Sequence, residues 1–120
     1  MGLYNFQKRF VPDILAGRKT HTIRAERAHP DVPGNTLHLY TGLRQKGAKL
    51  LMRVCCTKVE NIRISLNGVI YVDDVVLSPD ECEQLARRDG FLGRRSFMAF
   101  WKGRLPFEGH IIHLKFEGKQ

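Results

Sequence analysis

The stretch that decides the fold class is Arg63-Ile-Ser-Leu-Asn-Gly-Val-Ile-Tyr-Val72, followed by Ser78-Pro-Asp-Glu-Cys-Glu-Gln-Leu-Ala-Arg-Arg-Asp-Gly90. In the first segment, two β-rich runs flank Asn67-Gly68, the dipeptide most typical of a two-residue hairpin turn. In the second segment, Ser78 and Glu81 have the spacing of a capping box around a proline at the first helical position, which predicts a helix start. Together with the strands and helices expected in the rest of the chain, this segment indicates an α+β domain.

The rest of the chain adds short strands around this segment. Alternating or β-rich runs predict strands at 3–6, 20–24, 36–40, 50–64 (bent or broken near Glu60-Asn61) and 110–116. One short helix is expected to end at Gly17 and another to begin at Ser96. Five to seven short strands with these inserted helices predict a small, mostly antiparallel β-barrel. Residues 1–120 contain no linker or repeat, so we expect one domain.

The charge is unevenly distributed along the chain. The net charge is +8, and residues 1–63 carry all of the excess, with 12 Lys and Arg against 4 Asp and Glu. Residues 64–120 carry 8 of each. This distribution favours a basic face for an anionic partner such as nucleic acid or a nucleotide. The alternative interpretation is charge that merely keeps a small domain soluble.

Composition excludes several classes of protein. A content of 42% apolar and 27% charged residues is typical of a globular domain and argues against disorder. The chain has no apolar run of about 20 residues, and residues 1–6 lack the apolar region of a secretory signal, so we expect no membrane association. The three cysteines form no C-x-x-C pair, which predicts neither disulfides nor zinc and favours the cytoplasm.

The densest polar cluster is Gly17-Arg-Lys-Thr-His-Thr-Ile-Arg24. On a regular strand, Thr22 and Arg24 share one face, and Lys19 can join them at its entrance. A desolvated lysine can act as a general base, a threonine hydroxyl as a nucleophile, and an arginine as an anion or oxyanion donor. The alternative interpretation is a solvated edge strand.

Asp89 stands out on the predicted helix. It lies seven residues after Cys82 and four after Leu85, which places it on the apolar stripe rather than on the charged face. A carboxylate on a buried stripe needs a partner or a chemical task.

The pattern Gly17-x-Lys19-x-x-Thr22-x-Arg24, preceded by the short helix at 12–17, resembles the signature of the ASCH domain, a PUA-like β-barrel. The resemblance extends more weakly through Ala86–Phe91, the aromatic segment Phe97–Trp101 and the last strand. It implies a cleft lined by the Lys-Thr-Arg strand and an acidic residue from the helix. ASCH domains are linked to RNA binding. Some small members remove the acetyl group from N4-acetylcytidine with a lysine, a threonine and a glutamate, and others are ribonucleases.

Carried over by position, Lys19 and Thr22 match the catalytic lysine and threonine, and Arg24 matches the arginine that follows them. The acidic position falls on Asp89, which is one methylene shorter than the glutamate of the amidohydrolases. The resemblance implies amide hydrolysis without a metal or cofactor, and RNA or a nucleoside as the ligand.

Several other residues have both a functional and a structural interpretation. Trp101 has the helical spacing of a core residue but can also stack on a nucleobase, and Tyr40, on a strand expected beside the signature strand, is an equal candidate. His21 alternates away from Thr22, which favours a packed or surface role. The histidine spacings, including His110 and His113 on opposite strand faces, do not favour a metal site.

Three functions therefore remain open: an enzyme acting on a modified nucleobase or RNA, a non-catalytic RNA-binding module, and an adaptor in which a Lys19–Asp89 salt bridge is purely structural. Side chains of Lys19, Thr22 and Asp89 that meet in a closed pocket favour the enzyme. An open, shallow groove with Asp89 paired elsewhere, for example to Arg94 or Arg95, favours the binding module.

Overall fold

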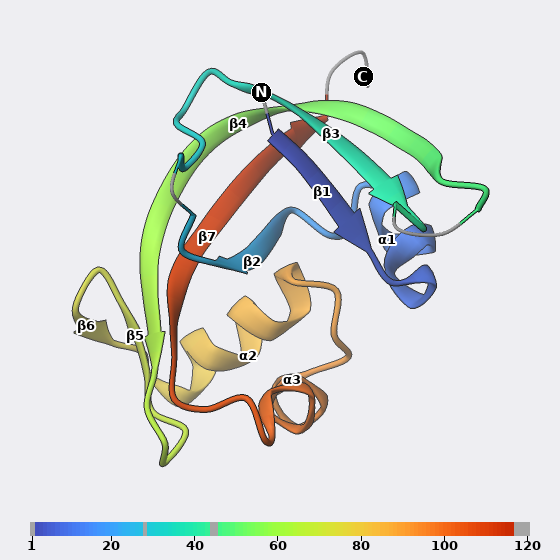
Figure 1. Ribbon diagram of the computed structural model, residues 1–120. Coiled ribbons are helices and arrows are strands. Elements are labelled where there is room, and N and C mark those ends of the chain that lie inside the picture. Colours follow the sequence, from blue (N-terminus) through green and yellow to red (C-terminus); the bar gives the residue numbers. More distant parts are fainter. Residues whose placement is uncertain (1, 28, 44–45, 117–120) are drawn as a thin grey trace.

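The computed structural model describes residues 2–27, 29–43 and 46–116 as an α+β fold (Figure 1). In the described residues, three short helices and a 3-10 turn interrupt seven strands, of which β6 was not predicted from the sequence. In chain order these elements are β1 (Gly2–Phe6), the turn Lys8–Phe10, α1 (Val11–Leu15), β2 (His21–Ala25), β3 (Thr36–Thr41), β4 (Lys49–Ile64), β5 (Ile70–Val72), β6 (Val75–Val76), α2 (Pro79–Arg88), α3 (Arg94–Trp101) and β7 (Phe107–Phe116).

The strands form one mixed sheet in the order β1-β3-β4-β5-β6, and β7 pairs with both β4 and β2. Only the pairing of β1 with β3 is parallel, so the sheet is mostly antiparallel as expected. In Figure 1, β4 and β7 run together as a long curved arc, and α2 and α3 lie on its concave side. None of the helices in the described part of the chain is long and apolar enough to cross a membrane.

The prediction of a closed barrel was wrong, because no ladder joins β2 to β1 within the described residues. Arginine side chains cross the gap between these strands instead. Arg24 Nη2 donates to the carbonyl oxygen of Asn5 at 2.8 Å, and Arg27 Nη2 donates to that of Leu3 at 3.3 Å. A guanidinium group takes more room than a backbone ladder, so these contacts satisfy the β1 carbonyls while they hold the seam open.

The long strand β4 bends at a different place from the one expected. It is continuous through Glu60-Asn61, and its register against β7 shifts between Cys56 and Lys58. An extra residue in one strand of an antiparallel pair bends that strand. Strand β4 pairs with β3 up to Cys55 and with β7 from Val54 onward, so the bulge lies just after the part of β4 that pairs with both neighbours.

Side-chain caps fix the first residues of helices α2 and α3. Ser78 Oγ accepts from the Glu81 backbone N–H at 3.2 Å, and Glu81 Oε1 accepts from the Ser78 N–H at 2.8 Å, which confirms the capping box. Helix α3 begins at Arg94, two residues before the predicted start. The reason is that Ser96 lies in the first turn, where its hydroxyl oxygen accepts from the Gly93 N–H at 3.4 Å.

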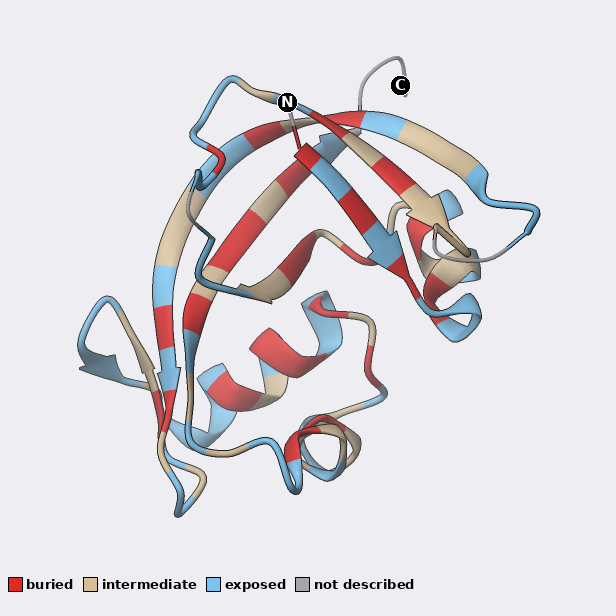
Figure 2. Cartoon of the chain, in the orientation of Figure 1, coloured by how far each residue is buried: buried red, intermediate tan, exposed pale blue. Residues whose placement is uncertain are grey.

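The core lies between the curved sheet and the helices (Figure 2). Its helical side is aromatic, with edge-to-face contacts of Phe91 to Phe10 and Phe97 and of Phe100 to Trp101. Five polar or charged residues are also buried: Lys19, His21, Thr22, Asp31 and Asp89. All of these except Asp31 lie where the start of β2 meets the C-terminal end of α2.

Candidate functional site

The site forms where the segment entering β2 is fastened to the end of α2. The Thr20 backbone N–H donates to the Arg88 carbonyl at 3.0 Å, which brings the two segments together. Gly90, with φ +97°, ends the helix, and a Cβ there would lie 3.1 Å from the Phe10 ring and 3.4 Å from Lys19 Cδ. A glycine is therefore required both for the backbone turn and for the close approach of Lys19.

Lys19 and Asp89 form a buried pair, with 3% and 6% of their surfaces exposed. Lys19 Nζ donates to Asp89 Oδ1 at 2.9 Å and to the Asp89 carbonyl oxygen at 2.5 Å. The ammonium group also lies 4.8 Å from the Phe10 ring centroid and 5.8 Å from that of Phe6. The lysine thus has an apolar wall on one side and a single carboxylate on the other.

Burial changes the protonation equilibria of this pair. It lowers the pKa of Lys19, an effect that the charge and hydrogen bond of Asp89 oppose. It raises the pKa of Asp89 to about 6, an effect that the charge and hydrogen bond of Lys19 oppose. In both residues desolvation is the largest influence, so the environment favours the neutral amine and the neutral carboxyl more than water does.

Thr22 and Arg24 lie next to this pair on β2. Arg24 Nε donates to Thr22 Oγ1 at 3.0 Å, and the Arg24 guanidinium lies 4.7 Å from the Phe6 ring centroid. Because the threonine oxygen accepts this bond, its own proton remains available to a base, and the adjacent cation favours negative charge on the oxygen. Burial, followed by the charge of Arg27, lowers the pKa of Arg24 to about 10.

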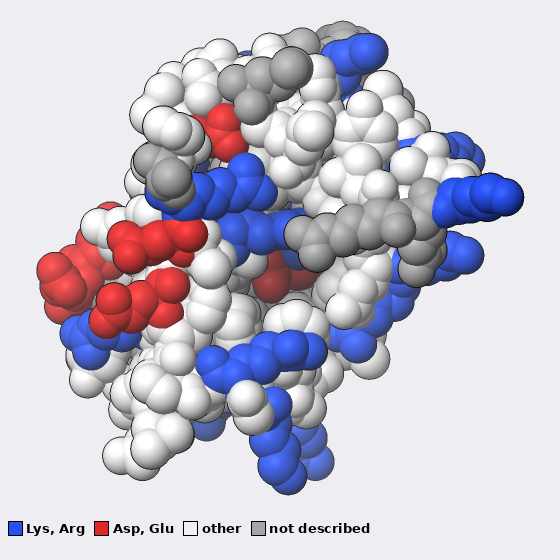
Figure 3. Space-filling view, in the orientation of Figure 1, with Lys and Arg blue, Asp and Glu red and all other residues white. Residues whose placement is uncertain are grey.

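These groups line one pocket of about 260 Å³. Its polar floor is Lys19, Thr22, Arg24 and Asp89, and its aromatic walls are Phe6, Phe10, Phe91, Phe100 and Trp101. Arginine side chains stack on the walls: the guanidinium of Arg9 lies 4.7 Å from the Phe10 ring centroid, and that of Arg104 lies 4.5 Å from the Phe100 centroid. Figure 3 shows basic side chains on both sides of a central hollow with acidic atoms at its base.

The structure brings together five of the six residues singled out from the sequence. Lys19, Thr22, Arg24, Asp89 and Trp101 all line the pocket. Tyr40 does not line it, because β3 pairs with β1 and β4, whereas β2 pairs with β7. The prediction that the Tyr40 strand lies beside the signature strand is therefore wrong.

Asp89 has no ion pair with Arg94 or Arg95 in the described part of the chain. The Arg94 backbone N–H instead donates to Glu83 Oε1 at 2.8 Å, which holds the start of α3 to α2. Of the two arrangements distinguished from the sequence, Asp89 follows the one in which it meets Lys19.

Sequence reasoning missed two features of the site. It did not single out Phe10 and Phe100 as site residues, although both line the pocket. It also separated His21 from the site by strand alternation, although His21 Nε2 lies 3.5 Å from Asp89 Oδ1. Alternation describes the two faces of a strand, whereas Asp89 approaches the first residue of β2 from the end of α2 and reaches both Lys19 and His21.

The described residues contain no group of three or more His, Cys, Asp or Glu side chains that could hold a metal ion. The three cysteines are present as free thiols. Burial raises the pKa of the Cys56 and Cys82 thiols, which disfavours the reactive thiolate. The cysteines therefore suit packing rather than nucleophilic chemistry.

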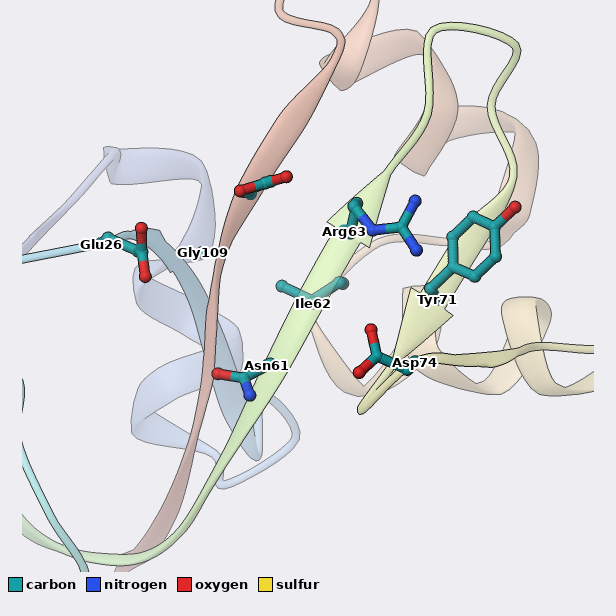
Figure 4. Close-up of a pocket in the computed structure, with 8 residues that line it drawn as sticks. Glu26, Asn61, Ile62, Arg63, Tyr71, Asp74 and Gly109 are labelled. Atoms are coloured by element: carbon teal, nitrogen blue, oxygen red, sulfur yellow. The ribbon is translucent and has the colours of Figure 1, made fainter.

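A second hollow, of about 250 Å³, lies on the outer side of β4, β5 and β7 (Figure 4). The Arg63 guanidinium lies 4.0 Å from the Tyr71 ring centroid, and Asp74 lies beside them. Glu26 and Glu108 also line this hollow. Its charged side chains are all exposed, so this outer hollow is a solvated surface with one stacked arginine.

The pocket at Lys19 therefore combines a desolvated amine, a hydroxyl beside a guanidinium, and a buried carboxylate. This set can move a proton, supply a nucleophile and hold a developing negative charge. Comparisons of the chain with protein-family models, curated proteins and solved structures found no significant match.

Proposed function

We propose that this protein is a hydrolase that removes the acyl group from an N4-acylated cytidine, in a domain of the ASCH, PUA-like type. The observation that carries the proposal is the buried contact of Lys19 with Asp89 in the pocket that Thr22 lines. The resemblance of residues 17–24 to the ASCH signature supports the assignment of these residues. The open seam between β1 and β2 makes the domain a wrapped sheet rather than a closed barrel.

Each polar residue has a role in this reaction. Lys19, in its neutral form, takes the proton from the Thr22 hydroxyl or from a water molecule. The resulting nucleophile attacks the acyl carbonyl carbon, and Arg24 stabilises the negative charge that develops on the carbonyl oxygen. Asp89 holds Lys19 in place, and the proton that Lys19 has taken passes to the nitrogen of the leaving cytosine. Water completes the reaction, which yields the carboxylic acid and the free amine.

The replacement of glutamate by aspartate is compatible with this arrangement. Asp89 Oδ1 lies 2.9 Å from Lys19 Nζ despite its shorter side chain. The reason is the backbone bond from Thr20 to Arg88, which draws the end of α2 toward β2. The aspartate therefore reaches the lysine without an additional methylene group.

The pocket also suits one nucleobase. Its volume of about 260 Å³ lies near the lower end of the range for small-molecule sites. Aromatic walls favour a flat ring, and the rim arginines Arg9 and Arg104 favour a phosphate attached to it. The pocket therefore fits a single base with its phosphates outside.

The test is hydrolysis of N4-acetylcytidine and its 5′-phosphate, followed by chromatography. Lys19→Ala and Thr22→Ala are expected to lower kcat/KM by at least about 100-fold, because each removes a proton-transfer or nucleophilic group. Arg63→Ala in the outer hollow is the matched control and should retain wild-type activity. Variants of Lys19 and Thr22 that hydrolyse the substrate as fast as wild type would contradict the assignment.

A second function, binding of RNA without chemistry, is favoured by a different observation. Both described hydrogen bonds of Lys19 Nζ go to Asp89, so the amine is already engaged in the absence of ligand. A binding module of this kind retains labelled single-stranded RNA unchanged, with an affinity that falls steeply with salt. The same chromatography separates this outcome from deacylation and from cleavage of the RNA chain by a ribonuclease.

A further inference from the structure

His21 is the least satisfied polar side chain near the site. It is completely buried, and neither of its ring nitrogens has a hydrogen-bond partner in the described part of the chain. Buried polar groups in folded proteins are almost always paired, and an unmet donor costs about 1–3 kcal/mol. A histidine kept in this position therefore calls for an explanation.

The carboxylate of Asp89, which lies close to the His21 ring, supplies this explanation. His21 Nε2 lies 3.5 Å from Asp89 Oδ1, the same oxygen that accepts from Lys19 at 2.9 Å. This separation is too long for a good hydrogen bond but only a few tenths of an ångström beyond one. Asp89 Oδ1 thus faces two nitrogen atoms and at present is bonded to one of them.

The ring of His21 is held from behind by β7. His21 is the register partner of His113, and their rings meet edge to face with centroids 5.6 Å apart. His113 is fixed in turn by Glu60 on β4, whose Oε1 lies 2.6 Å from His113 Nε2. His21 therefore cannot turn away from Asp89 without disturbing this contact across three strands.

We propose that His21 is a positioning residue for Asp89, with its proton on Nε2, and that it donates to Oδ1 when Lys19 turns toward the substrate. This role rests on the proposed function of Lys19 and Asp89. As Lys19 gives up its bond to the carboxylate, the imidazole replaces it and keeps Asp89 oriented. Asp89 thus exchanges one donor for another instead of becoming an unpaired buried charge.

The charges around His21 agree with a neutral ring. Burial is the largest influence that lowers its pKa well below 6.5, and the charges of Lys19, His113 and Arg88 act in the same direction. A neutral imidazole carries one N–H, so its choice of tautomer decides whether it faces the carboxylate with a donor or a lone pair. Only the Nε2–H tautomer attracts Asp89.

The first test uses the wild-type protein without substrate. Nitrogen-15 NMR of the His21 ring is expected to show a protonated Nε2 and an unprotonated Nδ1 between pH 6 and 8. The Nδ1–H tautomer would overturn the proposal, because Nε2 would then repel the carboxylate. This measurement requires neither activity nor a folded variant.

The second test measures the effect on Asp89. In a Lys19→Ala background, where Asp89 Oδ1 has lost its lysine donor, His21→Phe removes the donor that replaces it, so the carboxyl pKa of Asp89, followed by carbon-13 NMR, should rise by about one unit relative to Lys19→Ala alone. In an active enzyme that keeps Lys19, the acid limb of the pH profile of kcat, which reports the enzyme–substrate complex, should move upward by a similar amount in His21→Phe. His21→Gln, whose amide N–H can occupy the position of Nε2, should restore both values, whereas His21→Asn should not.

His38→Gln, on β3 and away from the pocket, is the matched control. An Asp89 pKa that His21→Phe leaves unchanged in a folded Lys19→Ala protein would overturn the positioning role. A protein with the expected tautomer and the expected Asp89 shift that hydrolyses no acylated cytidine would contradict the proposed function alone.

Discussion

The two hollows have nearly the same volume, about 260 Å³ at Lys19 and about 250 Å³ at Arg63, and both contain an arginine, an aromatic ring and a carboxylate. They differ in where the charges lie. In the inner pocket Lys19 and Asp89 are buried against phenylalanine rings, whereas the charged groups of the outer hollow stand in water. In the described part of the chain, only the inner pocket also contains a lysine and a threonine, and the comparison shows that its ion pair, unlike the charged groups of the outer hollow, is buried.

The origin of this difference is the layer that covers each hollow. Helices α2 and α3 cover the concave side of the sheet and place aromatic side chains around the inner pocket (Figures 1 and 2). The outer hollow lies on the other side of β4 and β7, where side chains alternate into solvent. Charges interact more strongly where water is excluded, so a charged side chain has a larger electrostatic effect in the inner pocket than in the outer hollow.

Removal of one aromatic ring from each hollow should give the largest contrast. Phe10→Ala takes a buried ring from between Lys19 and Phe91 and should lower the free energy of unfolding by about 4 kcal/mol. Tyr71→Ala removes a half-buried ring beneath Arg63 and should cost about 1 kcal/mol. Urea denaturation measures both. Equal decreases in the free energy of unfolding would contradict the difference in burial between the two hollows.

The second contrast is the dependence of stability on pH. The pKa of Asp89 is about 6 in the folded protein and 3.8 in its ordinary state, so the folded state binds this proton more tightly. The resulting stabilisation is fully present below pH 3.8 and is lost as the pH rises through 6. Its full size is about 3 kcal/mol. The lowered pKa of Lys19 acts in the opposite direction, because stability returns as that group loses its proton at higher pH.

Denaturation of wild type and Asp89→Asn between pH 4 and 6.5 isolates the contribution of the Asp89 carboxyl group to the pH dependence of stability. The advantage of wild type over the variant should shrink as the pH rises across this range. Thr22→Val is the control, because it alters the same pocket without removing a carboxyl group. A wild-type advantage that grows with pH would mean that the pairing with Lys19 outweighs desolvation.

Replacement of each arginine by lysine should give the smallest contrast. Arg24→Lys loses the fork that joins Thr22 Oγ1 to the Asn5 carbonyl and should cost about 2 kcal/mol. Arg63→Lys in the outer hollow should cost about 0.5 kcal/mol or less, because Arg63 is exposed. Denaturation midpoints measure both, and faster amide exchange in β1 should accompany only the first. A loss at Arg63 as large as that at Arg24 would contradict the role of the seam.

Local signals in the sequence predicted the local structure well. The Ser78–Glu81 capping box and the α+β class depend on neighbouring residues, and the structure confirms them. The hairpin around Asn67-Gly68 also forms, but its register places Ser65 opposite Val69, so the connection is longer than the two-residue turn that was predicted. The position of Asp89 on the apolar stripe of its helix predicted only that the carboxylate needs a partner or a chemical task. That Lys19 meets it was implied by the resemblance to the ASCH domain, with Arg94 or Arg95 as the alternative partner, and the structure shows the pair with Lys19.

Features that depend on distant segments were not predictable in the same way. Barrel closure failed because Arg24 and Arg27 bond to the β1 carbonyls, and no local pattern shows that a side chain will replace a ladder. Tyr40 lies away from the site because strand order, rather than strand content, decides its neighbours. The proximity of His21 to Asp89 depends on the angle at which α2 ends against β2.

The sequence by itself determined the elements, the buried face of each one and the residues able to carry chemistry, because periodicity and capping act over a few residues. Only the tertiary structure decided which of these residues meet, how far water is excluded from them and which of the two hollows is desolvated. The physical reason is that desolvation is a property of the packed layers around a group. The same lysine and aspartate on an open sheet would remain an ordinary solvated ion pair.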